Sequence, residues 1–269
     1  MTSTTLHSNI KTSGKLRKRI AMAVVGLLLL VIVGMTLRAN AVSSTTTFNF
    51  TQAELNDNWG PERIIPSGGY SSVGPFAGRT NVAEIRIDSF NSATDTYHRT
   101  EGIKTKYGAT DNFSKPGNLG QSVSVDLYLD PVWGTKAVRA GMWSVGDNGS
   151  NGTDAGNYPF GILEFAHVEG YEGFRFAGNN NWVKTRAFEG YGKWVTLNVS
   201  LDSTSHKYVY SINGTKVGYA NAPKVSTYLY SVILNQRNFG RDPQANLSAT
   251  SYDVHWHGSA ASQTEPDDK

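Results

Sequence analysis

The chain has 269 residues, of which 39% are hydrophobic and 17% charged, and it contains no cysteine. This suits one well-packed domain of about 200–250 residues and excludes disulfides and thiolate metal sites as its stabilisers. Six of the 25 Lys and Arg residues precede Val42, where no Asp or Glu occurs, so 19 basic and 22 acidic residues remain. The excess positive charge therefore belongs to the N-terminal segment, and the rest gives no reason to expect nucleic acid as a partner.

The first 41 residues have the layout of an export signal. Four basic residues between positions 15 and 19 precede an apolar run over 20–37, and Ala39-Asn40-Ala41 follows as an A-x-A cleavage motif. This pattern predicts a secretory signal peptide. The run is also nearly long enough to cross a membrane, so an uncleaved anchor is the alternative. Either way we expect a secreted or cell-surface protein that touches the membrane only through residues 20–37.

Composition divides the remainder into three parts. Residues 42–47 read as a short linker, because only Val42 among them is apolar. The folded domain is expected over 48–257. Residues 258–269 form a polar, acidic segment that is expected to be a disordered tail.

Side chains alternate between apolar and polar throughout the expected domain. In SVSVDLYL, residues 122–129, the apolar side chains of Val123 and Val125 point one way, and the polar side chains of Ser124 and Asp126 point the other. This period of two is typical of strands with one buried face. Further segments share the pattern: 47–50, 83–87, 173–176, 194–201, 208–212, 228–234, where Tyr230 is placed on the buried face with Val232 and Leu234, and 251–256.

Turn signals separate these strands. The 28 glycines and the Asn-Gly pairs at 148, 151 and 213 supply the positive φ angles that tight turns require. No segment after Leu37 keeps a helical period for more than about two turns. The sequence therefore predicts an all-β, two-sheet antiparallel β-sandwich, a jelly roll, preceded by one N-terminal hydrophobic helix.

One long stretch, WVTLNVSLDSTSHKYVYSINGTKVG at 194–218, resembles the paired strands of concanavalin A-like lectin/glucanase and laminin-G-like jelly rolls. The terminal YDVHWH, residues 252–257, resembles their closing strand. The resemblance covers residues 48–257. It implies a curved sheet whose concave face holds a polysaccharide, and edge loops that sometimes hold calcium. Such a face needs aromatic planes for the sugar rings and polar groups for their hydroxyls.

The segment EFAHVE, residues 164–169, is the first catalytic candidate. It resembles the E-x-D-x-x-E signature of the sandwich glucanases, which would make Glu164 the nucleophile and Glu169 the general acid of a glycoside hydrolase. A glycoside hydrolase that retains the configuration of the sugar needs two carboxyls about 5–5.5 Å apart. A β-bulge could bring Glu164 and Glu169 onto one face of the strand. Two observations oppose this: Ala166 stands where the signature has Asp, and Glu169 could lie in a hairpin turn.

The segment YHRTEG, residues 97–102, is the second catalytic candidate. Arg99 and Glu101 share one strand face, and the segment resembles the opening motif of jelly-roll alginate lyases, whose arginine neutralises a uronate carboxylate. The other motifs of those polysaccharide lyases have no convincing counterpart in this chain. A structural Arg–Glu pair is the alternative.

Binding candidates gather in an amide-rich segment and two turn-rich ones. Asn235, Gln236 and Arg237 follow an apolar strand and could hydrogen-bond sugar hydroxyls or pair with a carboxylate. Trp133 and Trp182 lie among turn residues, where a large ring has little core to fill, so both are expected as sugar platforms. The other tryptophans adjoin strands and are expected in the core: Trp59, Trp143, Trp194 and Trp256.

A metal site has weak support. Asp147 and Asp154 lie in a Gly- and Asn-rich loop that could hold one Ca²⁺, but the twelfth position of the loop pattern is Tyr158 instead of an acid. No cofactor is otherwise required. The favoured function is an exported carbohydrate-binding domain. A polysaccharide-degrading enzyme, hydrolase or lyase, is the alternative, and an envelope protein without a glycan ligand is the third possibility.

Overall fold

The computed structural model describes residues 45–62, 65–88, 100–105, 119–146, 160–224, 226–237 and 251–258. The chain divides into the units Met1–Ser43 and Ser44–Lys269, and the fold described is that of the second. The expected hydrophobic helix over 20–37 and nearly all of the expected tail lie outside the described residues. Within the described ranges, no helix is both long and apolar enough to span a membrane.

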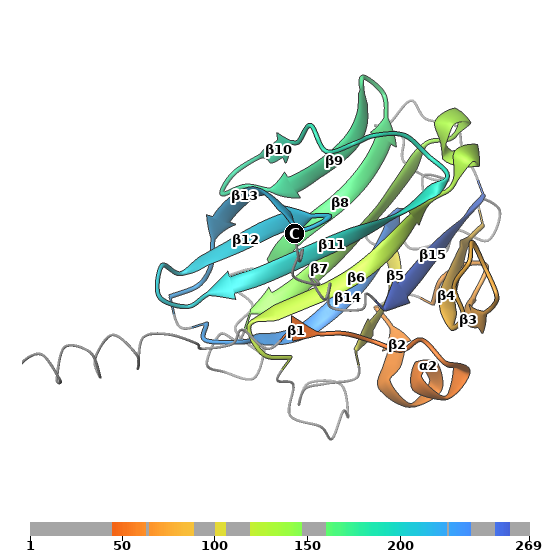
Figure 1. Ribbon diagram of the computed structural model, residues 1–269, viewed down its shortest axis with the longest axis horizontal. Coiled ribbons are helices and arrows are strands. Elements are labelled where there is room, and N and C mark those ends of the chain that lie inside the picture. The colour runs from red at the N-terminus through yellow and green to blue at the C-terminus, as the bar shows by residue number, and fades with distance from the viewer. Residues whose placement is uncertain are drawn as a thin grey trace, which may run out of the picture. The chain divides into compact units, whose positions relative to one another are not determined.

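The described strands form two antiparallel sheets, which confirms the predicted sandwich (Figure 1). The eight-stranded sheet has, in spatial order, β13 (Thr215–Asn221), β12 (Lys207–Ile212), β11 (Lys193–Asp202), β6 (Ser122–Leu129), β15 (Tyr252–Gly258), β4 (Val82–Ile87) and β3 (Tyr70–Val73), with β1 (Thr45–Thr46) parallel to β6. The seven-stranded sheet has β10 (Trp182–Lys184), β9 (Tyr171–Ala177), β8 (Phe160–Val168), β7 (Val138–Gly146), β14 (Leu229–Arg237), β5 (Thr100–Thr105) and β2 (Trp59–Pro61).

The apolar faces of the two sheets make the core. Val123 and Val125 of β6 are fully buried there, as the alternation predicts, and so are Phe165 of β8 and Phe174 of β9. On β14, Val232 and Leu234 are buried as expected, but Tyr230 is not, because the strand has a bulge between Leu229 and Ser231. The extra residue turns Leu229 into the core instead of Tyr230.

Two short helices connect the strands. Residues 47–50 were expected as a strand but have no strand pairing, because the chain turns into α2 (Gln52–Asn58) directly after them. Thr51 caps this helix: its hydroxyl accepts a hydrogen bond from the Glu54 backbone N–H at 3.1 Å. The 3₁₀ helix η2 (Pro131–Thr135) follows β6. The Asn-Gly turn expected at 213 joins β12 to β13, with φ of 49° at Asn213 and 75° at Gly214.

A hairpin around Phe76 and Arg79 covers part of the outer face of the eight-stranded sheet. Its two backbone hydrogen bonds join these residues at 2.8 and 2.9 Å. The Phe76 ring stacks on His255 of β15 at 3.7 Å, and Arg79 pairs with Asp126 of β6. His257 contacts Arg79 through Nδ1 at 3.1 Å. Burial and the Arg79 charge lower the pKa of His257, with Asp126 acting in the opposite direction.

A buried tyrosine gives a first test of the core. Tyr208→Phe removes the hydroxyl oxygen that accepts a hydrogen bond from the buried Gly146 backbone N–H at 3.1 Å. We expect the free energy of unfolding, measured by urea denaturation, to fall by about 1–3 kcal/mol, because the N–H loses this partner. Tyr219→Phe in the same hairpin is the control: its side chain is 53% exposed, and the change should stay within about 0.5 kcal/mol. Equal effects of the two substitutions would contradict the expectation.

The lowered pKa of His257 gives a second test. The unfolded chain binds a proton at this histidine more readily than the folded one, so stability is highest above the unfolded pKa of about 6.5 and falls as the pH drops through the folded value. Between pH 7 and 5, urea denaturation of His257→Gln should show a shallower loss of stability than the original chain. Identical pH slopes would show that His257 does not contribute.

Candidate functional site

The outer face of the seven-stranded sheet carries charged and aromatic residues in cross-strand rows. We call this surface the Glu164 face. Strand pairing places Asn235 of β14, Gly141 of β7, Glu164 of β8 and Arg175 of β9 in one row. The next row holds Trp143 of β7 and Trp182 of β10, with Ile233, Ile162 and Ala177 in the same row. All of them point away from the core, because the alternate residues of the same strands fill it.

Glu164 is the centre of an ion cluster on this face. Its side chain is 1% exposed, and each carboxylate oxygen accepts a hydrogen bond from a different arginine. Arg139 Nε donates to Oε2 at 2.6 Å and Arg175 Nε donates to Oε1 at 2.7 Å. These short, charge-assisted bonds fix both guanidinium groups, and the cluster keeps a net charge of about +1.

An aromatic ring lies against the same cluster. The guanidinium carbon of Arg175 is 4.4 Å from the centre of the Trp182 ring, and that of Arg139 is 5.0 Å from it. Such cation–π contacts hold the indole and the arginines together. The second tryptophan of the row, Trp143, contacts the Phe160 ring at 5.5 Å.

Two hydrogen-bond donors on this face have no partner. Asn235 Nδ2 and Trp143 Nε1 are buried from solvent, and neither makes a hydrogen bond. Asn235 is only 2% exposed. A buried donor without a partner costs free energy, so such groups are uncommon unless a ligand or water satisfies them. Both donors therefore mark positions where a polar ligand would be stabilised.

The position between Glu164 and Asn235 has no room for a Cβ atom. Gly141 lies between them on β7, and a Cβ atom there would stand 2.4 Å from the Glu164 Cβ. Neighbouring strands are about 4.8 Å apart, so the backbones of Glu164 and Asn235 are separated by roughly 10 Å. Gly141 therefore allows the Glu164 side chain to pack closely against β7, between the arginines and the Asn235 amide, and all three of these residues of the row are buried.

The two proposed catalytic glutamates do not share this face. β8 pairs with β7 and β9 without a register shift, so the bulge required to bring them together is absent from β8. Glu169 follows the end of the strand in the exposed turn before β9, as the hairpin alternative predicted. Strict alternation then separates the two carboxylates, since they are five residues apart.

Three predicted binding residues are on the core side. Trp133 was expected as an exposed platform, but it is fully buried, stacks on Phe165 at 5.8 Å and donates from Nε1 to the Asp253 carbonyl at 3.2 Å. The reason is that η2 folds its ring back over the end of the core. Gln236 and Glu101 are likewise buried, on the face opposite to Asn235, and the Glu101 carboxylate accepts a hydrogen bond from the Ser67 N–H at 2.6 Å.

The other predicted residues divide into those on the Glu164 face and those outside the described ranges. Trp182, Asn235 and Arg237 are on the face, where the Arg237 carbonyl accepts a hydrogen bond from Tyr252 Oη at 2.5 Å. Arg99, Asp147 and Asp154 lie outside the described residues. Within the described part of the chain, no group of three or more His, Asp and Glu side chains could hold a metal ion.

Sequence reasoning missed Arg139, Arg175 and Trp143. Trp143 was expected in the core because it adjoins an apolar strand, but it faces outward. The alternation of side chains in VRAGMW and GFRF could have revealed them. Once Ala140, Met142, Phe174 and Phe176 are assigned to the core, the residues that alternate with them must face outward.

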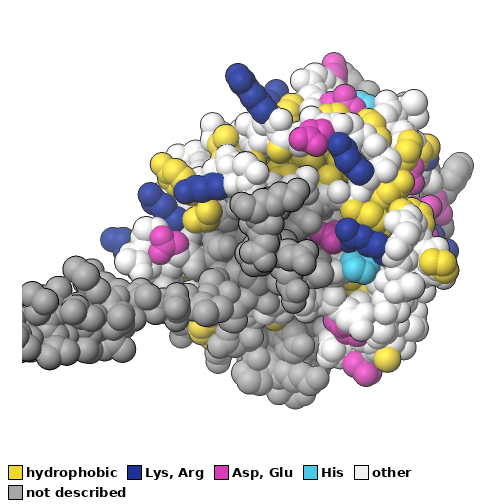
Figure 2. Space-filling model, viewed as in Figure 1, with side chains coloured by type: hydrophobic (Ala, Val, Ile, Leu, Met, Phe, Trp, Pro, Cys, Tyr) yellow, Lys and Arg dark blue, Asp and Glu magenta, His cyan; other side chains and the backbone are white. Residues whose placement is uncertain are grey.

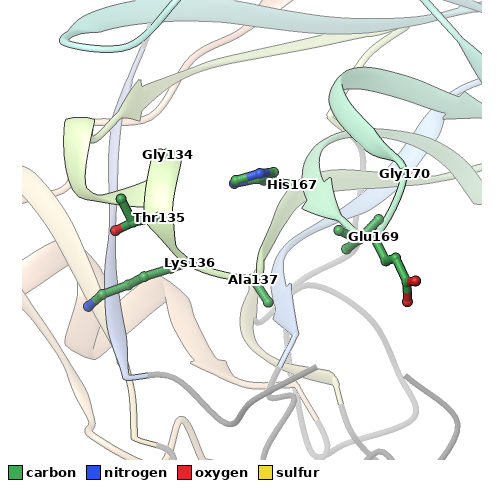
Figure 3. A pocket seen from close by; sticks show the side chains of 8 residues that line it. Gly134, Thr135, Lys136, Ala137, His167, Glu169 and Gly170 are labelled. Atoms are coloured by element: carbon green, nitrogen blue, oxygen red, sulfur yellow. The ribbon is translucent and has the colours of Figure 1, made fainter. Parts of the chain in front are cut away.

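A separate hollow lies beyond the end of β8. It has a volume of about 510 Å³ and is lined by Gly134–Ala137 and His167–Gly170. His167 Nδ1 donates to the Trp133 carbonyl at 2.7 Å, and in Figure 3 the Lys136 and Glu169 side chains extend in different directions. Lys136 Nζ donates to the Ser251 carbonyl at 2.6 Å. These polar groups do not converge on one point, so the hollow is a weaker candidate than the Glu164 face.

The view in Figure 2 offers no competing charged patch. Its Lys and Arg side chains are dispersed among acidic and hydrophobic ones over the part of the surface that belongs to described residues. The ion cluster around Glu164 is instead held by specific short hydrogen bonds. We therefore take the Glu164 face as the candidate functional site.

Comparison with known proteins identifies the fold. No family model and no curated protein matches the sequence. An endo-β-galactosidase from Clostridium perfringens that releases GlcNAcα1-4Gal matches with a TM-score of 0.50 and 12% identity, over 81% of this chain and 62% of that one. A Bacillus licheniformis β-glucanase has a TM-score of 0.46 and 11% identity, over 79% and 95% of the two chains.

A sialidase matches with a TM-score of 0.49 and 14% identity, over 81% of this chain but only 18% of the sialidase. The match to the endo-β-galactosidase, at 12% identity, shows the fold and not the substrate. The pairing of strands in two antiparallel sheets agrees with the match to the endo-β-galactosidase. The chain therefore has the concanavalin A-like jelly-roll fold.

Proposed function

We propose that this chain is an exported polysaccharide-binding protein whose ligand lies on the Glu164 face. The observation that carries the proposal is the cluster of Trp182, Arg139 and Arg175 around a buried carboxylate, beside two unpaired donors. The proposal of export rests on the signal-like segment over residues 1–41.

The chemistry of the face suits a sugar chain. Sugar rings present flat C–H surfaces that pack on indole, and Trp182 and Trp143 are available in one cross-strand row. Sugar hydroxyls accept hydrogen bonds from guanidinium and amide groups, which Arg139, Arg175 and Asn235 supply. A row that crosses four strands, from β14 to β9, is about 14 Å long, which gives room for more than one sugar unit.

Binding is favoured over hydrolysis by the state of Glu164. A retaining hydrolase needs a nucleophilic carboxylate and a second carboxyl about 5–5.5 Å away. Both oxygens of Glu164 are held by arginines, and Glu169 lies in the turn after β8. A polysaccharide-degrading enzyme remains the alternative function. Binding requires no cofactor, and a calcium ion at Asp147 and Asp154 stays an expectation from the sequence.

Truncation of Trp182 tests the site. Trp182→Ala should weaken retention of the full chain in affinity electrophoresis by about tenfold on any polysaccharide that retards it, because the ring loses its contact area. Trp194→Ala is the matched control, since Trp194 also stacks on an arginine, Arg79 at 4.5 Å, but on the other sheet. Equal loss in both variants, or retention by no polysaccharide, would contradict the proposal.

A turnover assay separates binding from catalysis. Incubation of the full chain with each retained polysaccharide should release no reducing ends and no unsaturated products, because both oxygens of Glu164 are held by arginines and Glu169 lies in the turn after β8. Reducing ends that disappear with Glu164→Gln but persist with Glu169→Gln would favour a hydrolase in which Glu164 acts with a different acid.

A further inference from the structure

We propose that the Glu164 face selects glycans whose sugar units carry an anionic group, a carboxylate or a sulfate ester. The inference rests on the proposed function and adds the charge class of the ligand. It is carried by the Arg139–Glu164–Arg175 cluster, in which two fixed guanidinium groups share one carboxylate.

The guanidinium edges that face away from Glu164 are available for a ligand. Each arginine uses its Nε atom on the carboxylate, and neither makes a further side-chain hydrogen bond within the described residues. The side chains of Arg139 and Arg175 are 15% and 16% exposed, so their unused donors are close to solvent. Planar guanidinium donors match the paired oxygens of carboxylates and sulfates, and the contact with Trp182 fixes their orientation.

Desolvation favours an anionic ligand over a neutral one. A sugar chain that covers the cluster removes the remaining water from two cations that share a single negative charge. Uncompensated positive charge is costly when water is removed, and an anionic group on the ligand would neutralise it. A neutral sugar offers only dipoles in exchange.

Most charged residues around the cluster are also positive. Lys184 adjoins Arg175 in the row, and Arg237 follows Asn235 on β14. Lys104 pairs with Ile233 in the row of Trp143. Among the described residues, strand pairing places one acidic residue besides Glu164 on this face. It is Glu62, which lies beside Gly102 at the β2 edge of the sheet. Five basic residues thus accompany two acidic ones, although the chain after residue 41 is acidic overall.

The unpaired donors extend the same complementarity. Asn235 Nδ2 and Trp143 Nε1 are hydrogen-bond donors without acceptors, and they lie in the rows that contain the cluster or adjoin it. Anionic sugars have more acceptor oxygens than neutral ones, and their oxygens accept stronger hydrogen bonds. The face therefore combines unpaired donors and positive charge on either side of Gly141.

The experiment compares polymers that differ only in charge. Affinity electrophoresis of the full chain would use polygalacturonate against its fully methyl-esterified form, and dextran sulfate against dextran. We expect at least tenfold tighter binding to one charged polymer than to its neutral partner, weakened when NaCl rises from about 0.05 to 0.5 M. The pair that shows the preference identifies the anionic group as carboxylate or sulfate.

Substitutions of Arg175 and Glu164 should have opposite effects on binding to the charged polymer. Arg175→Gln should weaken binding to the charged polymer about tenfold, and Arg175→Lys should restore part of it. Glu164→Gln keeps the side-chain shape and removes the negative charge, so it should strengthen binding to the charged polymer. For each variant the readout is the ratio of charged to neutral binding, because Arg175 also donates to neutral sugars in the proposed function. The controls Arg86→Gln and Glu84→Gln alter an Arg–Glu pair on the other sheet and should have no effect.

The outcomes separate the two proposals. Equal binding of charged and neutral polymers that depends on Trp182 would overturn the charge inference and leave the proposed function standing. Retention by none of the polymers would contradict both. If Glu164→Gln does not fold, as judged by circular dichroism, the arginine variants still decide: an unchanged ratio of charged to neutral binding in Arg175→Gln and Arg139→Gln would overturn the inference.

Discussion

Burial of one face of each sheet against the other is the constraint on which the rest of the structure depends. Without cysteine, the domain is stabilised by contacts such as those of Val125, Phe165 and Phe174 between the sheets. Because the strand period is two, filling the core fixes the direction of every second side chain, and the residues between them must face outward. The Glu164 face is the consequence of this constraint on β7, β8 and β9.

The polar residues on the outer faces of the two sheets have different partners. On the eight-stranded sheet, the hairpin of Phe76 and Arg79 covers polar residues of the strands: Arg79 pairs with Asp126, and the Phe76 ring stacks on His255. On the seven-stranded sheet, Glu164 holds two arginines against Trp182, while Asn235 keeps an unpaired donor. Similar residue types are therefore covered by a hairpin on one sheet, whereas on the other they form an arginine pair against a tryptophan.

The arrangement around Glu164 also shows how a carboxylate can organise a surface without being a nucleophile. A buried carboxylate between two arginines orients their guanidinium groups and offsets part of their charge. Gly141 allows this arrangement, because a larger side chain there would collide with Glu164. These residues act through the positions of their neighbours.

The sequence by itself determined the sandwich, most strands and the Asn213-Gly214 turn, since alternation and positive φ are local properties of the chain. It did not determine which strands pair. Only the tertiary structure brought Arg139, Glu164 and Arg175 together from three strands, moved Trp133 into the core and left Trp143 outside it. The physical reason is that cross-strand register and the bends of connections such as η2 depend on contacts between distant segments, which a local pattern does not encode.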